Sequence, residues 1–233
     1  MTDTITHTPS PPDLPASQKP ASGQNPANTR EIILNTAEHF FAERGVAATS
    51  IRDITGAAGV NLGAINYHFG TKQDLVAAVF TRCLEPVSKR QWALLDEVER
   101  ESGGRPPRLE ALIEAMIRPS VERSFAAGKR DTAFMRLVGR CYGEPNPEVE
   151  RRIRSLLEKV WIRFAGLVSR SLPGLTHEDM YWRIRLMVGA FHHTLLTTGR
   201  EGSVPPEIKK GLNAETMIRR LVTFAAAGIR AGA

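Results

Sequence analysis

The sequence predicts an all-α protein with an N-terminal helix-turn-helix three-helix domain and a larger C-terminal helical domain. From Asn28 onward apolar residues recur at helical spacing, and no segment alternates apolar and polar residues over the length of a strand. A short polar residue three positions before a carboxylate also recurs ahead of apolar runs, and this capping-box pattern marks helix starts. The pairs are Asn28 with Glu31, Ser50 with Asp53, and Thr71 with Asp74.

The bulk composition excludes several classes of protein. The 233 residues suffice for one large or two small domains, and a hydrophobic fraction of 42% supports a real core. The two cysteines lack CxxC spacing, which argues against a disulfide framework. Because the sequence shows neither a secretory signal nor an apolar run of membrane-spanning length, we expect a cytoplasmic protein with no membrane partner. The net charge of +6 permits an acidic partner without requiring one.

Residues 1–28 are expected to form a disordered N-terminal tail. They hold six of the 15 prolines, and Thr, Ser, Asn and Asp make up half of the rest. Such a segment buries too little apolar surface to offset the entropy lost on ordering.

Residues 29–75 are predicted to form the helix-turn-helix domain. A first helix covers 29–44, a second 51–58 and a third 61–68. Gly59 ends the second helix, because glycine tolerates the positive φ that this position requires.

Residues 76–233 are predicted to form an effector-binding and dimerisation domain. The fourth helix begins at Thr71, and Pro86 is expected to kink or end it before helical pattern resumes toward Glu101. The stretch 101–108, ESGGRPPR, is a clear break. Further helices are predicted near 108–127, 131–142, 146–171, 177–199 and 213–230.

The helices at 51–58 and 61–68, joined by AAGVN, match a helix-turn-helix, whose second helix lies in the DNA major groove. Gly63 and Ala64 allow close approach to the bases, and Leu62 and Ala64 suit contacts with thymine methyl groups. Asn61 serves as helix cap, base contact or both. The alternative for Leu62 is partial burial.

Polar side chains around this helix suit contacts with the DNA backbone. Asn66 is a further outward-facing position, and Tyr67 and His68 can donate hydrogen bonds to phosphate oxygens. Lys72 adds a cation at the start of the next helix, and Arg52 can reach a phosphate or a guanine. The alternatives are an ordinary helix end for Tyr67 and His68 and a solvated lysine for Lys72.

Charge alone does not nominate this segment as a DNA-binding surface. Residues 29–84 contain five Lys/Arg and five Asp/Glu. We therefore expect modest non-specific affinity with a shallow salt dependence, and a contribution of DNA shape to specificity.

The segment TREIILNTAEHFFAERGVAATSIRDITGAAGVNLGAINYHFGTKQDLVAAVF resembles the N-terminal domain of TetR-type transcriptional regulators. The resemblance implies nine or ten helices, a C-terminal domain for effector binding and dimerisation, and repression relieved by a small ligand. It implies DNA contacts at Arg52, Asn61, Leu62, Gly63, Ala64, Asn66, Tyr67, His68 and Lys72. Asn66 departs from the pattern, since family members often have tyrosine there.

The C-terminal stretches FMRLVGRCYGEP, YWRIRLMVGAFHHTL and LVTFAAAGIRAGA are similar to the fatty-acid-responsive, PsrA-like branch of this family. That resemblance implies a long-chain fatty acid or acyl-CoA effector and control of lipid metabolism.

The C-terminal helices offer apolar side chains for an effector pocket, since bundle helices can leave an apolar cavity between them. The alternative is that these side chains are plain core. Four arginines, at 136, 140, 183 and 185, could pair an acyl carboxylate or a phosphate, or remain solvated. The candidate liners are Met116, Phe134, Leu137, Trp161, Phe164, Met187 and Phe191.

The helices near 177–199 and 213–230 are predicted to form a homodimer interface. Gly189, Ala190 and residues 225–228, Ala-Ala-Ala-Gly, would allow close helix contact. Two recognition helices about 34 Å apart would read a palindromic operator, and a ligand that changes their separation would change the affinity for DNA.

Two other function classes fit less well. An enzyme is disfavoured because the sequence has no phosphate-binding loop and no nucleophile elbow, and His192 and His193 lack further metal ligands at helical spacing. We therefore predict no catalytic residue, metal site or cofactor. An architectural DNA binder would more often show a basic surface or a wedge side chain. A drug-responsive efflux-gene repressor and an activator both remain open.

Overall fold

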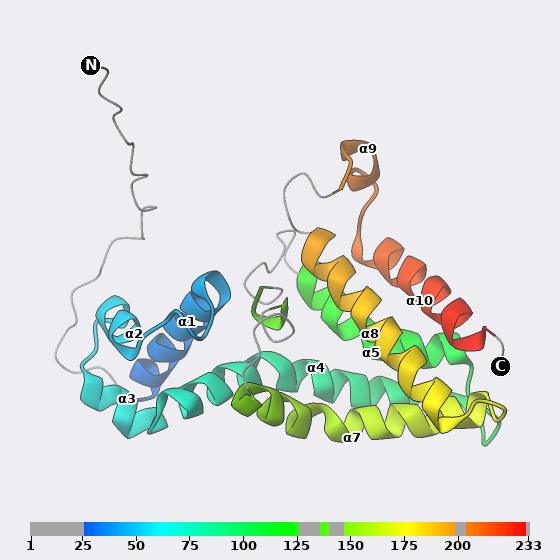
Figure 1. Ribbon diagram of the computed structural model, residues 1–233, viewed down its shortest axis with the longest axis horizontal. Helices are drawn as coiled ribbons and strands as arrows, with labels where there is room; N and C mark the ends of the chain where they lie inside the picture. The colour runs from blue at the N-terminus through cyan, green and yellow to red at the C-terminus, as the bar shows by residue number, and fades with distance from the viewer. Residues whose placement is uncertain (1–25, 126–135, 140–146, 199–203, 232–233) are drawn as a thin grey trace, which may run out of the picture.

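The computed structural model describes residues 26–125, 136–139, 147–198 and 204–231, and over these residues its regular secondary structure is entirely helical. The predicted all-α class is confirmed. Three N-terminal helices form one group, and a long helix connects them to a C-terminal bundle (Figure 1). The helices are α1 (Pro26–Arg44), α2 (Ile51–Ala58), α3 (Leu62–Phe69), α4 (Lys72–Ser102), α5 (Leu109–Phe125), α7 (Pro147–Ser171), α8 (His177–Thr198), α9 (Pro206–Lys209) and α10 (Ala214–Arg230).

The first helix starts earlier than its sequence pattern indicated. It begins at Pro26, so residues 26–28 belong to α1 and not to a disordered tail. The capping role predicted for Asn28 is therefore wrong. A proline suits the first turn of a helix because the N–H that it lacks has no partner within the helix there.

The predicted boundaries of α2 and of the start of α4 are confirmed by their caps. The backbone N–H of Asp53 donates to Ser50 Oγ over 3.1 Å, and that of Ser50 donates to Asp53 Oδ2 over 2.8 Å. Asp74 N–H donates to Thr71 Oγ1 over 3.1 Å in the same way. Gly59 has φ 66°, the left-handed conformation that lets α2 stop and the chain turn into α3.

The three N-terminal helices share a small core. Ile33, Phe41, Ile54 and Ile65, from α1, α2 and α3, are almost completely buried. Thr49 is buried in the α1–α2 connection, and its hydroxyl donates to Gly45 O over 2.7 Å. This arrangement fixes α2 and α3 on α1, so that the opposite side of α3 faces solvent.

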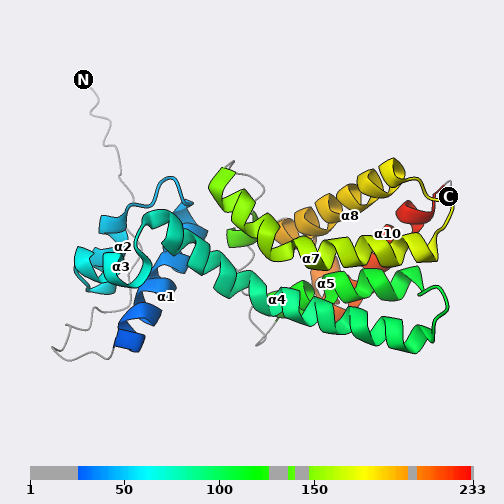
Figure 2. The same cartoon turned by 90° about the horizontal axis from the view of Figure 1, so that it is seen from below.

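Helix α4 belongs to both parts of the molecule (Figures 1 and 2). It has 31 residues and continues through Pro86, which therefore does not end it. The domain boundary predicted between residues 75 and 76 falls inside α4, so no linker separates the N-terminal helices from the bundle. The division into domains at that point stays a prediction.

Prolines lie inside both α4 and α5, and the two helices exchange side-chain hydrogen bonds beside them. Arg123 of α5 donates to the carbonyl of Cys83, three residues before Pro86, over 3.0 Å. Gln91 of α4 donates to the carbonyl of Met116, three residues before Pro119, over 2.6 Å. Because a proline loosens the hydrogen-bonding of the turn before it, these carbonyls are suited to accept from a neighbouring helix. We call this reciprocal arrangement the α4–α5 joint.

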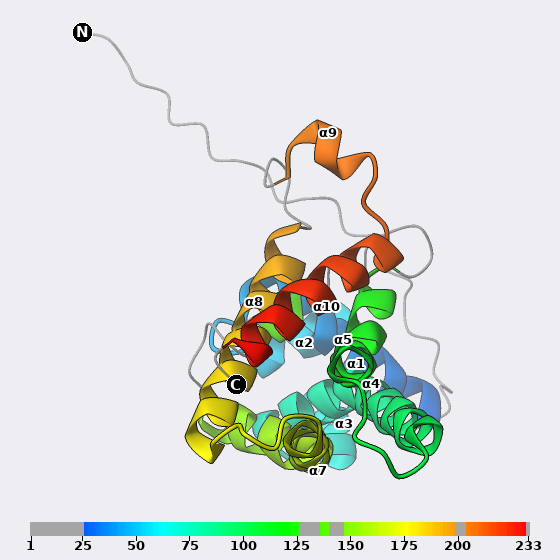
Figure 3. The same cartoon turned by 90° about the vertical axis from the view of Figure 1, so that its right-hand side faces the viewer.

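The rest of the bundle follows the predicted helices closely. Helices α7, α8 and α10 match the predicted segments, and α8 and α10 lie side by side on the outer side of the bundle (Figure 3). Of the helix predicted at 131–142, only residues 136–139 are described, and these are helical. The short α9 was not predicted. Among the described residues, no helix combines the length and apolarity needed to cross a lipid bilayer.

Candidate nucleic-acid interface and adjoining cavity

Helix α3 is anchored on one side and open on the other. Ile65 is buried in the core, whereas Leu62 is 55% exposed and Tyr67 is 81% exposed. The alternative of a partly buried Leu62 is therefore wrong. Two large side chains presented to solvent on an eight-residue helix indicate a surface built for contact.

Asn61 caps α3, as one of its predicted roles required. Its Oδ1 accepts from Ala64 N–H over 2.9 Å, which leaves its NH₂ group as the donor available outside the helix. Gly63 makes room for this cap, because a Cβ placed there would lie 3.2 Å from Asn61 Oδ1. Ala64 is half-buried and packs against the core, so it faces outward less than expected.

The polar candidates surround this exposed face. Arg52, Asn66 and Tyr67 are exposed, and His68 is half-buried with its ring edge-on to Tyr67, the ring centroids 4.9 Å apart. Lys72 is half-buried in the first turn of α4.

The carboxylate of Asp53 offsets part of the positive charge on this surface. Hydrogen bonds from Ser50, helped by the charges of Arg44 and Lys72, hold the pKa of Asp53 below its ordinary value. Asp53 is therefore a carboxylate at neutral pH and offsets part of the positive charge of Lys72. This agrees with the zero net charge of the segment.

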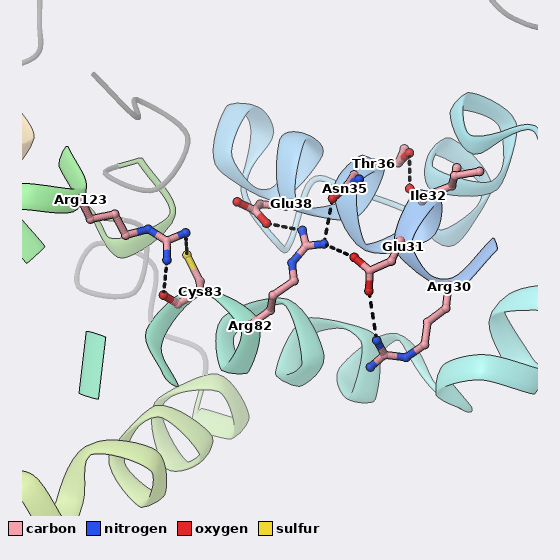
Figure 4. A network of polar contacts seen from close by, with 9 residues as sticks. All are labelled: Arg30, Glu31, Ile32, Asn35, Thr36, Glu38, Arg82, Cys83 and Arg123. Carbon is pink, nitrogen blue, oxygen red and sulfur yellow. Dashed lines mark hydrogen bonds and ion pairs between the residues drawn. The ribbon is translucent and has the colours of Figure 1, made fainter. Parts of the chain in front are cut away.

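Arg82 fixes α1 to α4, a role that sequence reasoning missed (Figure 4). Its guanidinium donates to Asn35 over 2.8 Å and to Glu31 over 3.3 Å, and it also pairs with Glu38. The next residue, Cys83, accepts from Arg123 of α5. Adjacent positions of α4 therefore hold α1 on one side and the bundle on the other. The three partners of Arg82 lie more than 40 residues away in the sequence, so no local pattern reveals them.

A cavity of about 60 Å³ lies in the bundle, among α4, α5, α7, α8 and the 136–139 turn. Four of the predicted liners contribute to its wall: Met116, Trp161, Met187 and Phe191. Leu137 and Phe164 are buried but do not line it, which matches the alternative of plain core. Phe134 lies outside the described residues.

The arginines proposed as partners for an acidic ligand point elsewhere where they are described. Arg136 pairs with Glu43 of α1, and Arg183 donates to the Ile229 carbonyl over 2.7 Å. Arg185 is exposed, and Arg140 lies outside the described residues.

Three polar residues interrupt the apolar wall: Gln91, Ser120 and His192. Gln91 occupies a core position of α4, at helical spacing from Leu84 and Val87, which also line the cavity. A polar residue in an otherwise apolar stripe was the sequence signal that could have identified it. Burial of the imidazole lowers the pKa of His192 to about 4, so this side chain is neutral at pH 7.

Comparison with known proteins agrees with this architecture. Residues 33–79 match the family model "Bacterial regulatory proteins, tetR family", and residues 114–228 match "Tetracyclin repressor-like, C-terminal domain". The HTH-type transcriptional regulator CymR from Pseudomonas putida is 31% identical over 159 residues, which cover 67% of this chain and 73% of CymR.

Solved structures with the same fold extend over most of the chain. NalD, the secondary repressor of the MexAB-OprM multidrug efflux pump in Pseudomonas aeruginosa, has a TM-score of 0.57 and 23% identity, covering 87% of this chain and 95% of NalD. The fatty acid degradation regulator FadR from Bacillus halodurans has a TM-score of 0.57 and 15% identity, covering 90% of this chain and 99% of FadR. At these identities the structures establish the fold alone. Together with the two family models and CymR, they show that this chain belongs to the TetR family of DNA-binding transcriptional regulators, which are not enzymes.

Proposed function

We propose that the protein is a homodimeric repressor that binds a palindromic operator through α3 of each subunit and leaves it when a small apolar effector binds the bundle. The observation that carries the proposal is the exposed face of α3, opposite the buried Ile65, with Leu62 and Tyr67 directed to solvent. In a helix-turn-helix protein this face enters the major groove.

In this proposal two sets of residues in and around α3 contact the DNA, one set at the bases and the other at the phosphates. The NH₂ group of Asn61 and the side chain of Leu62 contact base edges and thymine methyl groups, while Gly63 and Ala64 keep the helix close to the bases. The residues that position the protein on the phosphates are Arg52, Asn66, Tyr67, His68 and Lys72.

The outer faces of α8 and α10 support the proposed dimer. Leu186 of α8 is 70% exposed and Phe224 of α10 is 66% exposed. A Cβ added at Gly189 or Gly228 would meet no atom within 4 Å. Glycine inside a helix is destabilising, and nothing in the described part of the subunit requires it at these positions, so close approach of a second subunit explains both.

One part of the predicted interface is wrong. Ala225 and Ala226 were expected to face the partner, but they are buried in the core of their own subunit. The exposed positions of the same turn are Phe224, Ala227 and Gly228. The interface therefore uses the other side of α10.

The α4–α5 joint offers a route from the effector to α3. Leu84, Val87 and Gln91 line the cavity, and Arg82, which precedes them in the same helix, holds α1. A ligand that displaces α4 relative to α5 would carry α1 and α3 with it. The resulting change in affinity for DNA is limited by the difference between the ligand's affinities for the two conformations.

The effector class is inferred from the C-terminal sequence. The sequence resemblance suggested a long-chain fatty acid or acyl-CoA. The fold gives no preference, since its neighbours include both a regulator of fatty acid degradation and a repressor of an efflux pump. A drug-responsive repressor or an activator is the alternative within the family.

Genome-wide footprinting with the purified full-length protein tests the proposal. We expect a small set of palindromic sites, with binding relieved by an apolar effector; acyl-CoA and free fatty acids form two arms. Lys72→Ala should weaken binding to these sites, whereas Lys89→Ala, on an exposed part of the same helix, should not. Absence of any preferred duplex would overturn the proposal, and absence of lipid genes from the bound sites would overturn the acyl assignment alone.

A further inference from the structure

One end of the Gln91 side-chain amide, in the cavity wall, has no hydrogen-bond partner among the described residues. Gln91 is only 6% exposed, and its Nε2 donates to the Met116 carbonyl over 2.6 Å. Its Oε1 is buried and has no hydrogen-bond partner among the residues that the structure describes. Burial removes the hydrogen bonds that this carbonyl oxygen would make with water, and no donor in the described part of the protein replaces them. An unsatisfied buried acceptor of this kind destabilises the folded state.

The orientation of this amide is fixed by its neighbour. The carbonyl of Met116 can only accept, so the nitrogen of Gln91 must face it and the oxygen must be the other end. Gln91 and Met116 both line the cavity. The acceptor that remains therefore belongs to a side chain that lines the cavity, and α5 holds that side chain in place.

The surroundings of this acceptor are apolar and uncharged. Trp161, Met187 and Phe191 belong to the wall, and its described members include no Lys, Arg, Asp or Glu. His192 is neutral at pH 7, because burial lowers its pKa to about 4. Ser120 is the remaining polar residue.

We propose that the effector is an uncharged, mainly apolar molecule that donates one hydrogen bond, from a hydroxyl or N–H group, to Oε1 of Gln91. This inference rests on the proposed function, in which the cavity is the effector site. A carboxylate would set its own acceptor oxygens against that of Gln91 and would lose its hydration without a cation in the described wall. Free fatty acids therefore fall outside the expected class.

The same residue connects recognition of the ligand with the α4–α5 joint. Gln91 uses one end of its amide to hold α4 on α5, and the other end is the acceptor proposed to bind the ligand. A ligand bound at Oε1 acts directly on a side chain that spans the joint, two turns from Cys83 and Arg82.

Three para-substituted toluenes test the chemistry on the full-length protein in the absence of DNA. They are 4-methylphenol, which donates a hydrogen bond, 4-methylanisole, which does not, and 4-methylbenzoate, which carries a carboxylate. By isothermal titration calorimetry we expect 4-methylphenol to bind at least about tenfold more tightly than 4-methylanisole, with 4-methylbenzoate weakest. Equal affinities, tightest binding of the benzoate, or no saturable binding of the phenol would overturn the inference.

Substitution of Gln91 identifies the acceptor. In Gln91→Met the preference for the phenol over the anisole should disappear, while the affinity for the anisole changes less than about threefold. Ser120→Ala is the matched control and should keep the preference; loss of the preference in this variant and not in Gln91→Met would overturn the assignment. If Gln91→Met fails to fold, as judged by circular dichroism, the wild-type probe series still decides. A gel shift with operator DNA separates this inference from the proposed function. If the protein shifts the operator but the probes bind in another order of affinity, only the inference about Gln91 is overturned.

Discussion

Substitutions of Asn61 separate its structural role from its role in DNA recognition. The side chain caps α3 through one hydrogen bond, from Ala64 N–H to Oδ1 over 2.9 Å. Serine and aspartate cap helices about as well as asparagine, whereas alanine does not. Asn61→Ser and Asn61→Asp should therefore leave the free energy of unfolding unchanged, and Asn61→Ala should lower it by about 1 kcal/mol.

The same three variants should rank differently in DNA binding. In a major groove about 12 Å wide, a carboxylate at position 61 would lie about 6 Å from phosphates on either side. At that distance each repulsion costs about 0.7 kcal/mol in water, or about 1.4 kcal/mol per subunit. For a dimer the total of about 3 kcal/mol corresponds to roughly a hundredfold loss of affinity at low salt.

Urea denaturation and fluorescence anisotropy with a labelled operator would measure the two quantities. We expect Asn61→Asp to keep the stability of the wild type and to bind the operator weakly. Asn61→Ser should also keep its stability and should lose less affinity for the operator. If Asn61→Asp binds the operator as tightly as the wild type, the start of α3 does not enter the groove and the proposed recognition surface is wrong.

The remaining predictions concern the dimer, pH and the α1–α4 contact. Leu186→Arg should give monomers in analytical ultracentrifugation, while Ile162→Arg, at another exposed apolar position, should not; a dimeric Leu186→Arg would contradict the interface. Burial lowers the pKa of His192 from its ordinary 6.5 to about 4 in the folded protein. The unfolded chain therefore takes up a proton first as the pH drops, and the free energy of unfolding should fall by about 2 kcal/mol from pH 7 to pH 5. That loss should vanish in His192→Gln and persist in His193→Gln when urea denaturation is followed across this pH range, and an unchanged pH dependence in both would contradict it. Arg82→Met should speed amide hydrogen exchange in α1 and leave α10 unchanged, and equal exchange in α1 would show that Arg82 does not hold it.

Helix boundaries set by local chemistry were predictable from the sequence. Ser50, Gly59 and Thr71 act on backbone groups within a few residues, so their patterns report the caps directly. The start of α1 was missed because Asn28 offered an equally good local pattern. The structure instead uses Pro26, whose fixed φ also suits a first turn.

The exposed face of α3 was predictable for the same reason, and the packing of the bundle was less so. Which side of α3 is exposed follows from Ile65 and its spacing to Leu62 and Tyr67. Whether Phe164 lines a cavity or fills the core depends on how three or four helices meet, which spacing along one helix does not determine. The contacts of Arg82 were not predictable either, because they join segments far apart in the chain.

The continuity of α4 through Pro86 has a mechanical consequence for a regulator of this kind. From Val87, in the cavity wall, to Lys72, beside α3, the helix extends about 22 Å. A tilt of about 10° around Val87 would swing its first turn by about 4 Å, which exceeds the rise of about 3.4 Å per base pair along DNA. Under the proposed function, a ligand of a few atoms bound beside Val87 is therefore large enough to move the α3 helices of the two subunits out of register with the DNA.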